Sequence, residues 1–304
     1  MKKVVLIGGG HGLSNIVKGF KNENVDLTIV VSSTDDGGHT GKIRDEFNVV
    51  ALGDLRRVLY ELLDDNVFLK NVFDYRFDLL HDVDKVSLGN LILCCLYNKY
   101  GDINKVIDFF KEKENIKANV YLSSDNPLTL CAKCKNGEVV KNEHMIGICD
   151  KKIEDLYVDG EAICNVSMLK KIEEADVIVL GPGSLYTSVG SVLCIDKIKN
   201  AIKASFAEIV YVCNIMCQKG ETSNYNVNDH EEALVKIIDR KIDRVIVNIG
   251  KIEEDVLKRY EGECRGLVNL TEIKQYYELY DLVEIEDNKV IHNSELTKKI
   301  ILKQ

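Results

Sequence analysis

Two short apolar segments of this chain each end in a glycine-rich turn that leads directly into a helical pattern. The first is VVLI at 4–7, followed by GGGHGLS at 8–14, and the second is VIVL at 177–180, followed by GPGSLYTS at 181–188. A strand, a glycine turn and a helix in this order are typical of α/β folds with a parallel sheet. The free N–H groups at such a helix start also favour an anion such as phosphate. The sequence therefore predicts an α/β protein with anion-binding turns.

Strand and helix patterns alternate along most of the 304 residues. Apolar residues at helical spacing predict helices at 13–20, from 54 to about 100, and at 103–113, 170–174, 184–191, 197–204 and 229–239. Short apolar, β-branched runs predict further strands at 26–31, 120–122, 129–133, 139–140, 209–214 and 244–249. We predict one Rossmann-like domain over 1–304, a three-layer αβα fold with a mostly parallel sheet. A helical insertion at about 54–115 and a β-hairpin region at about 119–158 interrupt it.

Charge and composition exclude several classes of function. Lys and Arg total 40 against 49 for Asp and Glu, a net charge of −9, which opposes general binding to nucleic acid. Because no apolar run approaches the roughly 18 residues of a membrane helix, neither a membrane span nor a signal peptide is expected. Most of the ten cysteines lie inside apolar segments, as in a reducing cytoplasm. The Cys131 and Cys134 pair has no second pair at zinc-ribbon spacing.

The two glycine-rich turns provide the first candidate ligand-binding residues. In the first turn they are Gly8, Gly9, Gly10, His11 and Gly12, and in the second they are Gly181, Gly183 and Ser184. The first turn lacks the Lys-Ser/Thr ending of a Walker loop and only approximates the dinucleotide fingerprint. Ser184 is placed either to cap the following helix or to donate to a ligand oxygen. A glycine turn that serves packing alone is the alternative for each.

A polar loop after the 26–31 strand contains the segment DDGGHTGKIR. Asp35 and Asp36 are expected to bind ribose hydroxyls or, as a pair, a divalent metal ion. Lys42 and Arg44 are expected to reach phosphate oxygens, and Arg suits a two-pronged contact. A solvated Asp/Gly turn, with the carboxylates bonded to their own backbone, is the alternative.

Further candidates are neutral side chains after the 209–214 strand and two residues at helix starts. Asn214, Gln218 and Thr222 offer donors and acceptors suited to a sugar or a base edge. Tyr225 offers a stacking face or is a packed core residue. The remaining candidates are Asp54 and Asn90, each of which could instead serve as a helix cap. No nucleophilic triad can be assigned from these residues.

Six ordered motifs of the chain resemble the gluconeogenesis factor family of bacteria, the YvcK-type proteins with a CofD-like domain. The motifs are GGGHGLS, DDGGHTG, GDLRRVL, SLGNLIL, GPGSLYTS and VCNIMCQKGET, and they extend over most of the sequence. The 2-phospho-L-lactate transferases are more distant relatives in this resemblance. His11 stands where the family has Thr, His39 where it has Ser, and Lys85-Val86 where it has Gly-His.

The resemblance implies a cytoplasmic Rossmann-like protein that binds UDP-glucose or UDP-N-acetylglucosamine and supports cell shape and wall synthesis on gluconeogenic carbon. It implies a homo-oligomer with wall-synthesis partners and no required cofactor. The alternative is a phosphotransferase in which Asp35 or Asp36 holds Mg²⁺. A dinucleotide oxidoreductase fits less well, because a placed hydride-transfer acid is missing. Because His11 is expected to lie beside a ligand phosphate, we predict that ligand binding depends on pH near 6 to 7.

Overall fold

The computed structural model describes residues 1–65, 68–77, 86–260, 266–286 and 288–304. Lys85 and the side chain of His39 lie outside this part, so the expectations attached to them stay predictions. Within the described residues, no helix is both long enough and apolar enough to cross a membrane.

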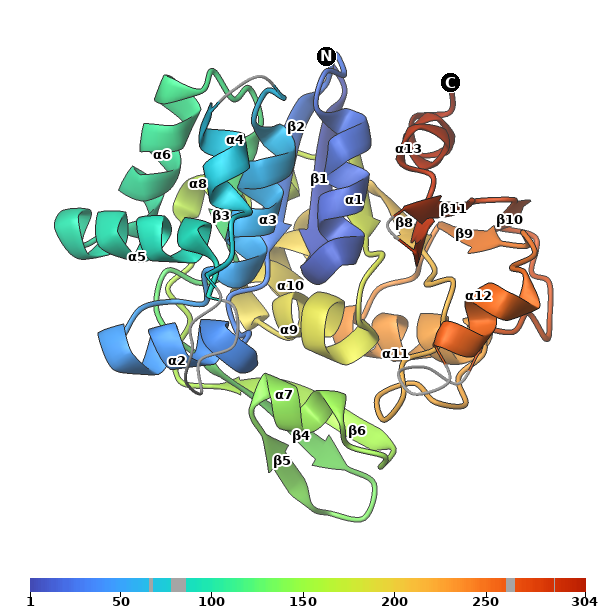
Figure 1. The fold of residues 1–304 in the computed structure, drawn as a ribbon. Helices are drawn as coiled ribbons and strands as arrows, with labels where there is room; N and C mark the ends of the chain where they lie inside the picture. The colour runs from blue at the N-terminus through green and yellow to red at the C-terminus, as the bar shows by residue number, and fades with distance from the viewer. Residues whose placement is uncertain (66–67, 78–85, 261–265, 287) are drawn as a thin grey trace.

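Seven parallel strands form the central sheet, in the order β10-β9-β8-β7-β1-β2-β3 (Figure 1). They are β1 Lys3–Gly8, β2 Asp26–Val31, β3 Asn119–Leu122, β7 Val177–Leu180, β8 Glu208–Val212, β9 Arg244–Asn248 and β10 Tyr277–Tyr280. The expected Rossmann-like α/β fold is confirmed. The strand β10 was not predicted from the sequence.

Helices cover both faces of the sheet, because strand residues alternate between two apolar cores. Val4 and Leu6 of β1 pack into one core, and Val5 and Ile7 pack into the other. The first core contains α1 Gly10–Phe20, α3 Gly53–Leu62, α4 Phe68–Phe73, α5 Leu88–Tyr100, α6 Ile103–Lys113 and α13 Ser294–Leu302. The second contains α8 Val166–Glu173, the π-helical η1 Leu185–Gly190, α9 Ser191–Leu193, α10 Asp196–Ala204 and α11 Val227–Ile238.

A small antiparallel unit, here called the cap, projects from the main body (Figure 1). It consists of β4 Thr129–Cys134, β5 Val139–Lys141, α7 Glu143–Gly147 and β6 Ile153–Asp159, with the strand order β5-β4-β6. The cap packs against η1 and α9 through α7 and β6. The expected hairpin region begins at about 119, but β3 pairs with β2 in the main sheet, so the cap covers only 129–159.

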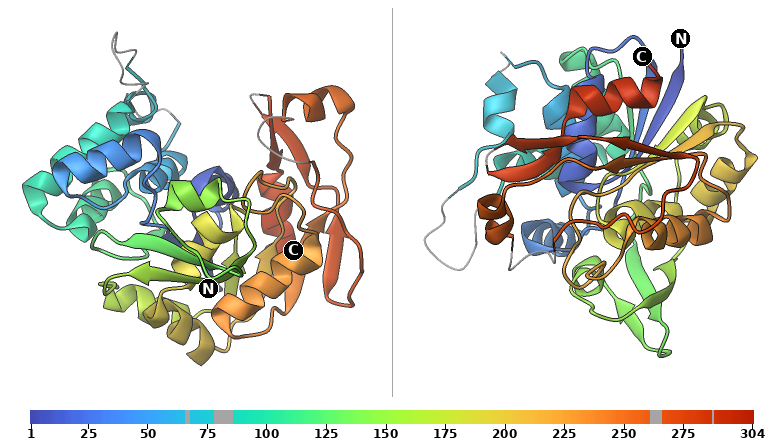
Figure 2. Two further views of the ribbon diagram at one scale, coloured as in Figure 1. Left: turned by 90° about the horizontal axis from the view of Figure 1, so that it is seen from below. Right: turned by 90° about the vertical axis from the view of Figure 1, so that its right-hand side faces the viewer.

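Several elements differ from the sequence-based expectations, among them α7, β6 and α13, for which no helix or strand was predicted. The helix α2 Gly38–Phe47 begins inside the segment expected to be a loop, and α12 Glu254–Arg259 lies beyond the last predicted strand. An antiparallel hairpin of β11 Val283–Glu286 and β12 Lys289–His292 follows β10. This hairpin and α13 lie beside α1 (Figure 2). The hairpin therefore borders the start of α1, where the first glycine turn lies.

Candidate functional site

The two glycine turns meet at the point where the sheet changes direction. The strand β1 lies between β2 and β7, and the chain proceeds outward from β1 on one side and from β7 on the other. Ligands of doubly wound sheets bind at such a switch point. A Cβ at Gly12 would lie 2.4 Å from the carbonyl oxygen of Pro182, and one at Gly183 would lie 3.2 Å from that of Gly9. The two turns can come this close together because Gly12 has no side chain.

A cavity of about 200 Å³ opens between the turns and is here called the switch crevice. Five of the predicted residues line it, namely His11, Gly12, Gly183, Ser184 and Asn214. The structure thus brings together residues that are separated by some 200 positions in the chain.

Neutral side chains hold the second turn in place. The Asn214 side chain donates to the carbonyl of Gly183 at 2.8 Å and accepts from its N–H at 3.0 Å. The Ser184 hydroxyl donates to Gln218 Oε1 at 2.6 Å, and it makes no capping bond to the helix. The Gln218 N–H in turn donates to Thr222 Oγ1 at 3.0 Å. The predicted sugar-binding groups after β8 therefore support the turn directly.

A carboxylate of the chain already occupies the first turn. Asp54, at the start of α3, is 6% exposed and accepts from the Gly10 N–H at 2.7 Å. Its other oxygen accepts from Arg57 Nη1 at 2.6 Å. A Cβ at Gly9 would lie 2.5 Å from the same carboxylate. Asp54 is therefore an integral part of this turn, and Gly8 forms the end of β1 below it.

The adjacent carboxylates Asp35 and Asp36 lie in different surroundings. Asp36 accepts from the backbone N–H groups of Glu143 and His144 at 3.2 and 2.9 Å, at the N-terminal end of α7 in the cap. Burial and the negative charge of Asp54 raise the pKa of Asp35. Asp35 and Asp36 therefore have different partners, and the expectation that they bind a metal ion as a pair stays a prediction. Among the described residues, no group of three His, Cys, Asp or Glu side chains is placed to hold a metal.

The remaining predicted cations lie away from the crevice lining. Lys42 is exposed on α2. Arg44 donates to the carbonyl of Thr34 at 3.3 Å and to that of Leu128 at 2.7 Å, which ties the loop after β2 to the start of the cap. Asn90 is buried at the start of α5, and its Oδ1 has no hydrogen-bond partner within the described ranges.

Two glutamates, the half-buried Glu143 and the buried Glu221, connect the cap and the second turn. Glu221 accepts from the N–H groups of Tyr186 and Thr187, the latter at 2.9 Å, and burial raises its pKa to about 7. Burial raises the pKa of Glu143 to about 9, and the negative charges of Asp35 and Glu221 act in the same direction. Glu143 is therefore protonated at neutral pH. Sequence reasoning missed Glu143 because its burial depends on how the cap packs.

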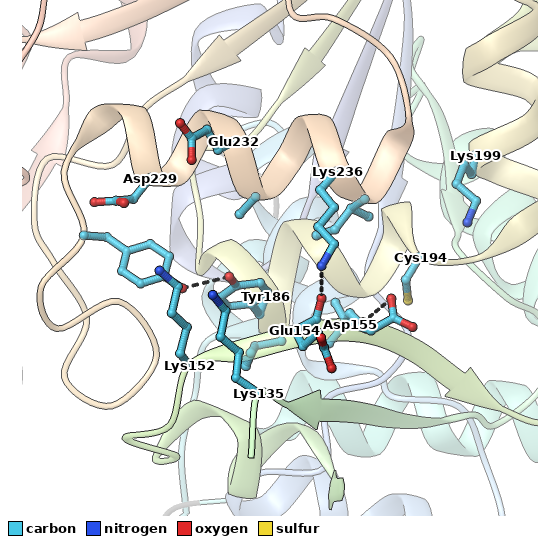
Figure 3. Close-up of a pocket in the computed structure, with 15 residues that line it drawn as sticks. Lys135, Lys152, Glu154, Asp155, Tyr186, Cys194, Lys199, Asp229, Glu232 and Lys236 are labelled. Atoms are coloured by element: carbon cyan, nitrogen blue, oxygen red, sulfur yellow. Dashed lines mark hydrogen bonds between the residues drawn. The ribbon is translucent and has the colours of Figure 1, made fainter. Parts of the chain in front are cut away.

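Tyr225 lies in a different cavity, of about 280 Å³, between the cap and α11. Its hydroxyl lies 3.0 Å from that of Tyr186, as Figure 3 shows for the labelled Tyr186 and its neighbour. Figure 3 also shows Lys135 and Lys152 of the cap on one side and Asp229 and Glu232 of α11 on the other. This space is here called the cap cavity. Tyr225 is thus partly buried against other aromatic rings and is not among the residues that line the switch crevice.

A third cavity, of about 560 Å³, continues from the switch crevice between α1, α3 and the β11–β12 hairpin. The two spaces share His11, Asn15 and Ile291. The larger one, here called the cationic cavity, is lined by Lys18, Arg56, Arg57, Lys70, Arg76 and Lys289, together with four acidic residues. Desolvation of the His11 ring, followed by the positive charge of Arg57 and Lys289, lowers its pKa to about 4. In the free protein, His11 therefore titrates below the expected range of pH 6 to 7.

The hairpin supplies crevice residues that sequence reasoning missed. Asn15 donates to the carbonyl of His292 at 2.5 Å, and the His292 ring lies 3.0 Å from the Cys213 carbonyl. Burial lowers the pKa of His292 to about 4, so the ring is neutral. The segment VEIE before Asp-Asn alternates apolar and polar residues, but KVIH after it does not. The sequence therefore carries only part of the pattern that is typical of a hairpin.

Comparisons with known proteins agree with this fold. Residues 4–284 match the family model described as 2-phospho-L-lactate transferase CofD. The gluconeogenesis factor of Bacillus subtilis is 35% identical over 263 residues, which cover 86% of this chain and 83% of that protein. A Thermotoga maritima protein provisionally given the same name is 39% identical over 269 residues, 88% of this chain and 85% of that one. The crystal structure of a UPF0052 family protein from Bacillus halodurans matches with a TM-score of 0.92 and 31% identity, covering 99% of this chain and all of that one.

Proposed function

The chain belongs to the CofD family, and from this premise we propose that it is a gluconeogenesis factor that binds a UDP-sugar in the switch crevice. UDP-N-acetylglucosamine and UDP-glucose are the proposed ligands. In this proposal the protein is a cytoplasmic, homo-oligomeric regulator, and it acts on cell shape and wall synthesis through protein partners. The names of its relatives support the gluconeogenic role. The remaining parts follow from the family resemblance.

The contact between the two glycine turns is the observation that carries this proposal. Gly12 lies against the Pro182 carbonyl, so the backbone of both turns borders one narrow space. Backbone N–H groups at helix starts bind phosphate oxygens without a charged side chain. A diphosphate placed there would leave the nucleoside and sugar to the adjoining groups, among them Asn214 and His11.

Several polar side chains around the crevice are already hydrogen-bonded within the protein, and this favours ligand binding over catalysis. Ser184 bonds Gln218, Asn214 bonds the Gly183 backbone, and Asp54 bonds the Gly10 N–H. General acid–base chemistry needs a group that can exchange a proton with the substrate. A regulator that only binds its ligand requires no such group and no cofactor.

One observation favours the alternative of a metal-dependent phosphotransferase. The negative charge of Asp54 helps to raise the pKa of Asp35, so the two carboxylates lie near each other beside the first turn. Mg²⁺ is bound by one or two carboxylates together with substrate phosphates. In this alternative Asp35 and Asp54 hold the ion, which neutralises charge on the transferred group.

A ligand screen in the presence and absence of metal separates the two. Thermal-shift and calorimetric titrations would use UDP-N-acetylglucosamine, UDP-glucose, NAD and GTP, each with magnesium and with chelator. We expect both UDP-sugars to raise the melting temperature in chelator as much as in magnesium. Stabilisation only in magnesium, together with its loss in Asp35→Asn, would support the transferase. Stabilisation by NAD or GTP alone would contradict the proposal.

A further inference from the structure

The cationic cavity contains two buried arginine N–H groups that lack a hydrogen-bond partner within the described part of the chain. They are the Nε–H groups of Arg56 and Arg57, which are consecutive on α3. A buried donor on a charged group is costly to leave unsatisfied, and native proteins rarely do so. The two groups therefore indicate an acceptor that the described part of the chain does not supply.

Other contacts hold both guanidinium groups in place. Arg57 Nη1 donates to Asp54 at 2.6 Å, and Arg56 Nη1 donates to Asp74 at 3.1 Å and to the Phe73 carbonyl at 3.3 Å. The Arg56 side chain is only 5% exposed. These bonds hold both guanidinium groups in fixed positions beside the cavity.

Six lysines and arginines and four acidic residues line the cavity. Glu286 pairs with Lys18 at 2.8 Å and Asp65 pairs with Lys70 at 2.5 Å, while Asp74 pairs with Arg56. Burial raises the pKa of the remaining acid, Glu61, and the positive charges of Lys70 and Lys18 act in the opposite direction. Arg57 is balanced by Asp54 of the first turn, and Lys289 adds a further charge from the hairpin.

The pKa of His11 indicates that the electrostatic potential is positive where the cavity meets the switch crevice. After desolvation, the causes that lower its pKa are the charges of Arg57, Lys289, Arg56 and Arg76. Cations from α3 and from the hairpin therefore act together at this opening. A positive potential next to unpaired donors favours an anionic ligand group.

We propose that the cationic cavity binds an oxyanion group, a carboxylate or a phosphate, that accepts from the Nε–H groups of Arg56 and Arg57. The proposed function places the diphosphate of a UDP-sugar in the switch crevice, and the location of the oxyanion next to that diphosphate rests on this function. Because the crevice and the cavity share His11, Asn15 and Ile291, one molecule can extend from one into the other. The oxyanion belongs either to an acidic sugar of the bound nucleotide or to a separate small anion.

Calorimetric titration with three probes distinguishes these sources. UDP-glucuronate differs from UDP-glucose by a carboxylate in place of a hydroxymethyl group. If the oxyanion belongs to the sugar, we expect UDP-glucuronate to bind at least tenfold more tightly than UDP-glucose. If it is a separate anion, we expect inorganic phosphate to bind to protein that is already saturated with UDP-glucose.

Two variants test where the oxyanion lies. Arg57→Lys keeps a positive charge beside Asp54 but removes the Nε–H group, and Lys289→Gln removes one charge from the hairpin. Each should reduce the UDP-glucuronate preference, or the phosphate affinity, at least fivefold. Lys105→Gln, an exposed position on α6, is the matched control and should leave both values within twofold.

The outcomes separate this inference from the proposed function. Equal affinity for the two UDP-sugars, without phosphate binding to the UDP-glucose complex, would overturn the inference and leave the proposed function standing. A preference that persists in Arg57→Lys and Lys289→Gln would also overturn it. Phosphate binding that is lost in Arg57→Lys, in a protein that binds neither UDP-sugar, would support the oxyanion site and contradict the proposed function.

Discussion

The cationic cavity and the cap cavity both carry several basic side chains, but these side chains are partnered differently. In the cationic cavity, Arg56 and Arg57 are held on α3 with buried N–H groups for which the described residues supply no acceptor. In the cap cavity, Lys135 and Lys152 are exposed to solvent, and Tyr186 and Tyr225 satisfy each other. Water can serve an exposed ammonium but not a buried guanidinium. Unsatisfied buried donors therefore distinguish a ligand site better than cavity volume or lysine content does.

The largest effect on UDP-sugar affinity is expected from a substitution that forces the two glycine turns apart. In Gly12→Ala, the new Cβ would meet the backbone of Pro182 at 2.4 Å, so the turns must separate. We expect UDP-sugar affinity to fall at least 100-fold, about 2.7 kcal/mol. Isothermal calorimetry with UDP-glucose and UDP-N-acetylglucosamine would measure it.

The matched control is Gly137→Ala at the tip of the cap. Gly137 has a φ of +84° and open space around it, so alanine there strains the backbone without a clash. It should cost about 1 kcal/mol of stability and leave UDP-sugar affinity unchanged. Full affinity in Gly12→Ala would mean that the ligand does not bind between the turns.

Local patterns predicted the elements of the main body but not those defined by distant contacts. The strands β2 and β7 are short apolar runs bounded by turns, and the structure places them at the predicted residues. The edge strand β10 has the sequence YELY and is only partly buried, so its apolar pattern is weak. In the hairpin, β11 alternates apolar and polar residues but β12 does not, so its pattern is also incomplete.

The same limit applies to the site. The glycine turns were located because a turn of this kind depends on residues that are adjacent in sequence. The direction of Asp36 was not predictable, because it is set by α7, about 107 positions further along the chain. Tyr225 is oriented by Tyr186, which lies 39 positions away. Sequence reasoning thus identified the loops, and packing decided which of their side chains line the switch crevice.

The buried acid of the cap should make stability depend on pH. The pKa of Glu143 is about 9 in the folded protein and near 4.5 in the unfolded chain. Between these values the folded state holds a proton that the unfolded state has released, so stability falls as pH rises. The Glu143→Gln variant should remove up to about 1.4 kcal/mol per pH unit of this slope. Urea unfolding at pH 5, 6, 7 and 8 would measure it.

An exposed glutamate of the cap provides the comparison for Glu143. The hydrogen bond and positive charge of Lys151 lower the pKa of Glu138, so Glu138 titrates below this window. Glu138→Gln should therefore keep the wild-type slope. Parallel curves for Glu143→Gln and the wild type would show that Glu143 is not protonated in the folded cap.

The imidazole at the mouth of the cationic cavity should couple ligand binding to proton uptake. Its pKa is about 4 in the free protein, and a bound phosphate would raise it. Affinity should therefore increase as pH falls through the pKa of His11 in the ligand-bound protein. The total increase should be about tenfold for each unit by which the ligand raises that pKa. Calorimetry from pH 5 to 8 would show this slope in the wild type. His11→Asn should flatten it, and equal slopes in both proteins would exclude His11 as the group that takes up the proton.

The smallest effect is expected in the cap cavity. Lys152 is exposed, and Asp229 and Glu232 face it across the space without an ion pair between them in the described structure. Charge removal at such a position changes stability by about 0.5 kcal/mol or less. Lys152→Gln should therefore keep UDP-sugar affinity within twofold, whereas Lys289→Gln should weaken an acidic UDP-sugar at least fivefold relative to UDP-glucose. Parallel titrations of the two variants make this comparison. If Lys152→Gln had the larger effect, the ligand would occupy the cap cavity, and unsatisfied buried donors would not mark the binding site in this fold.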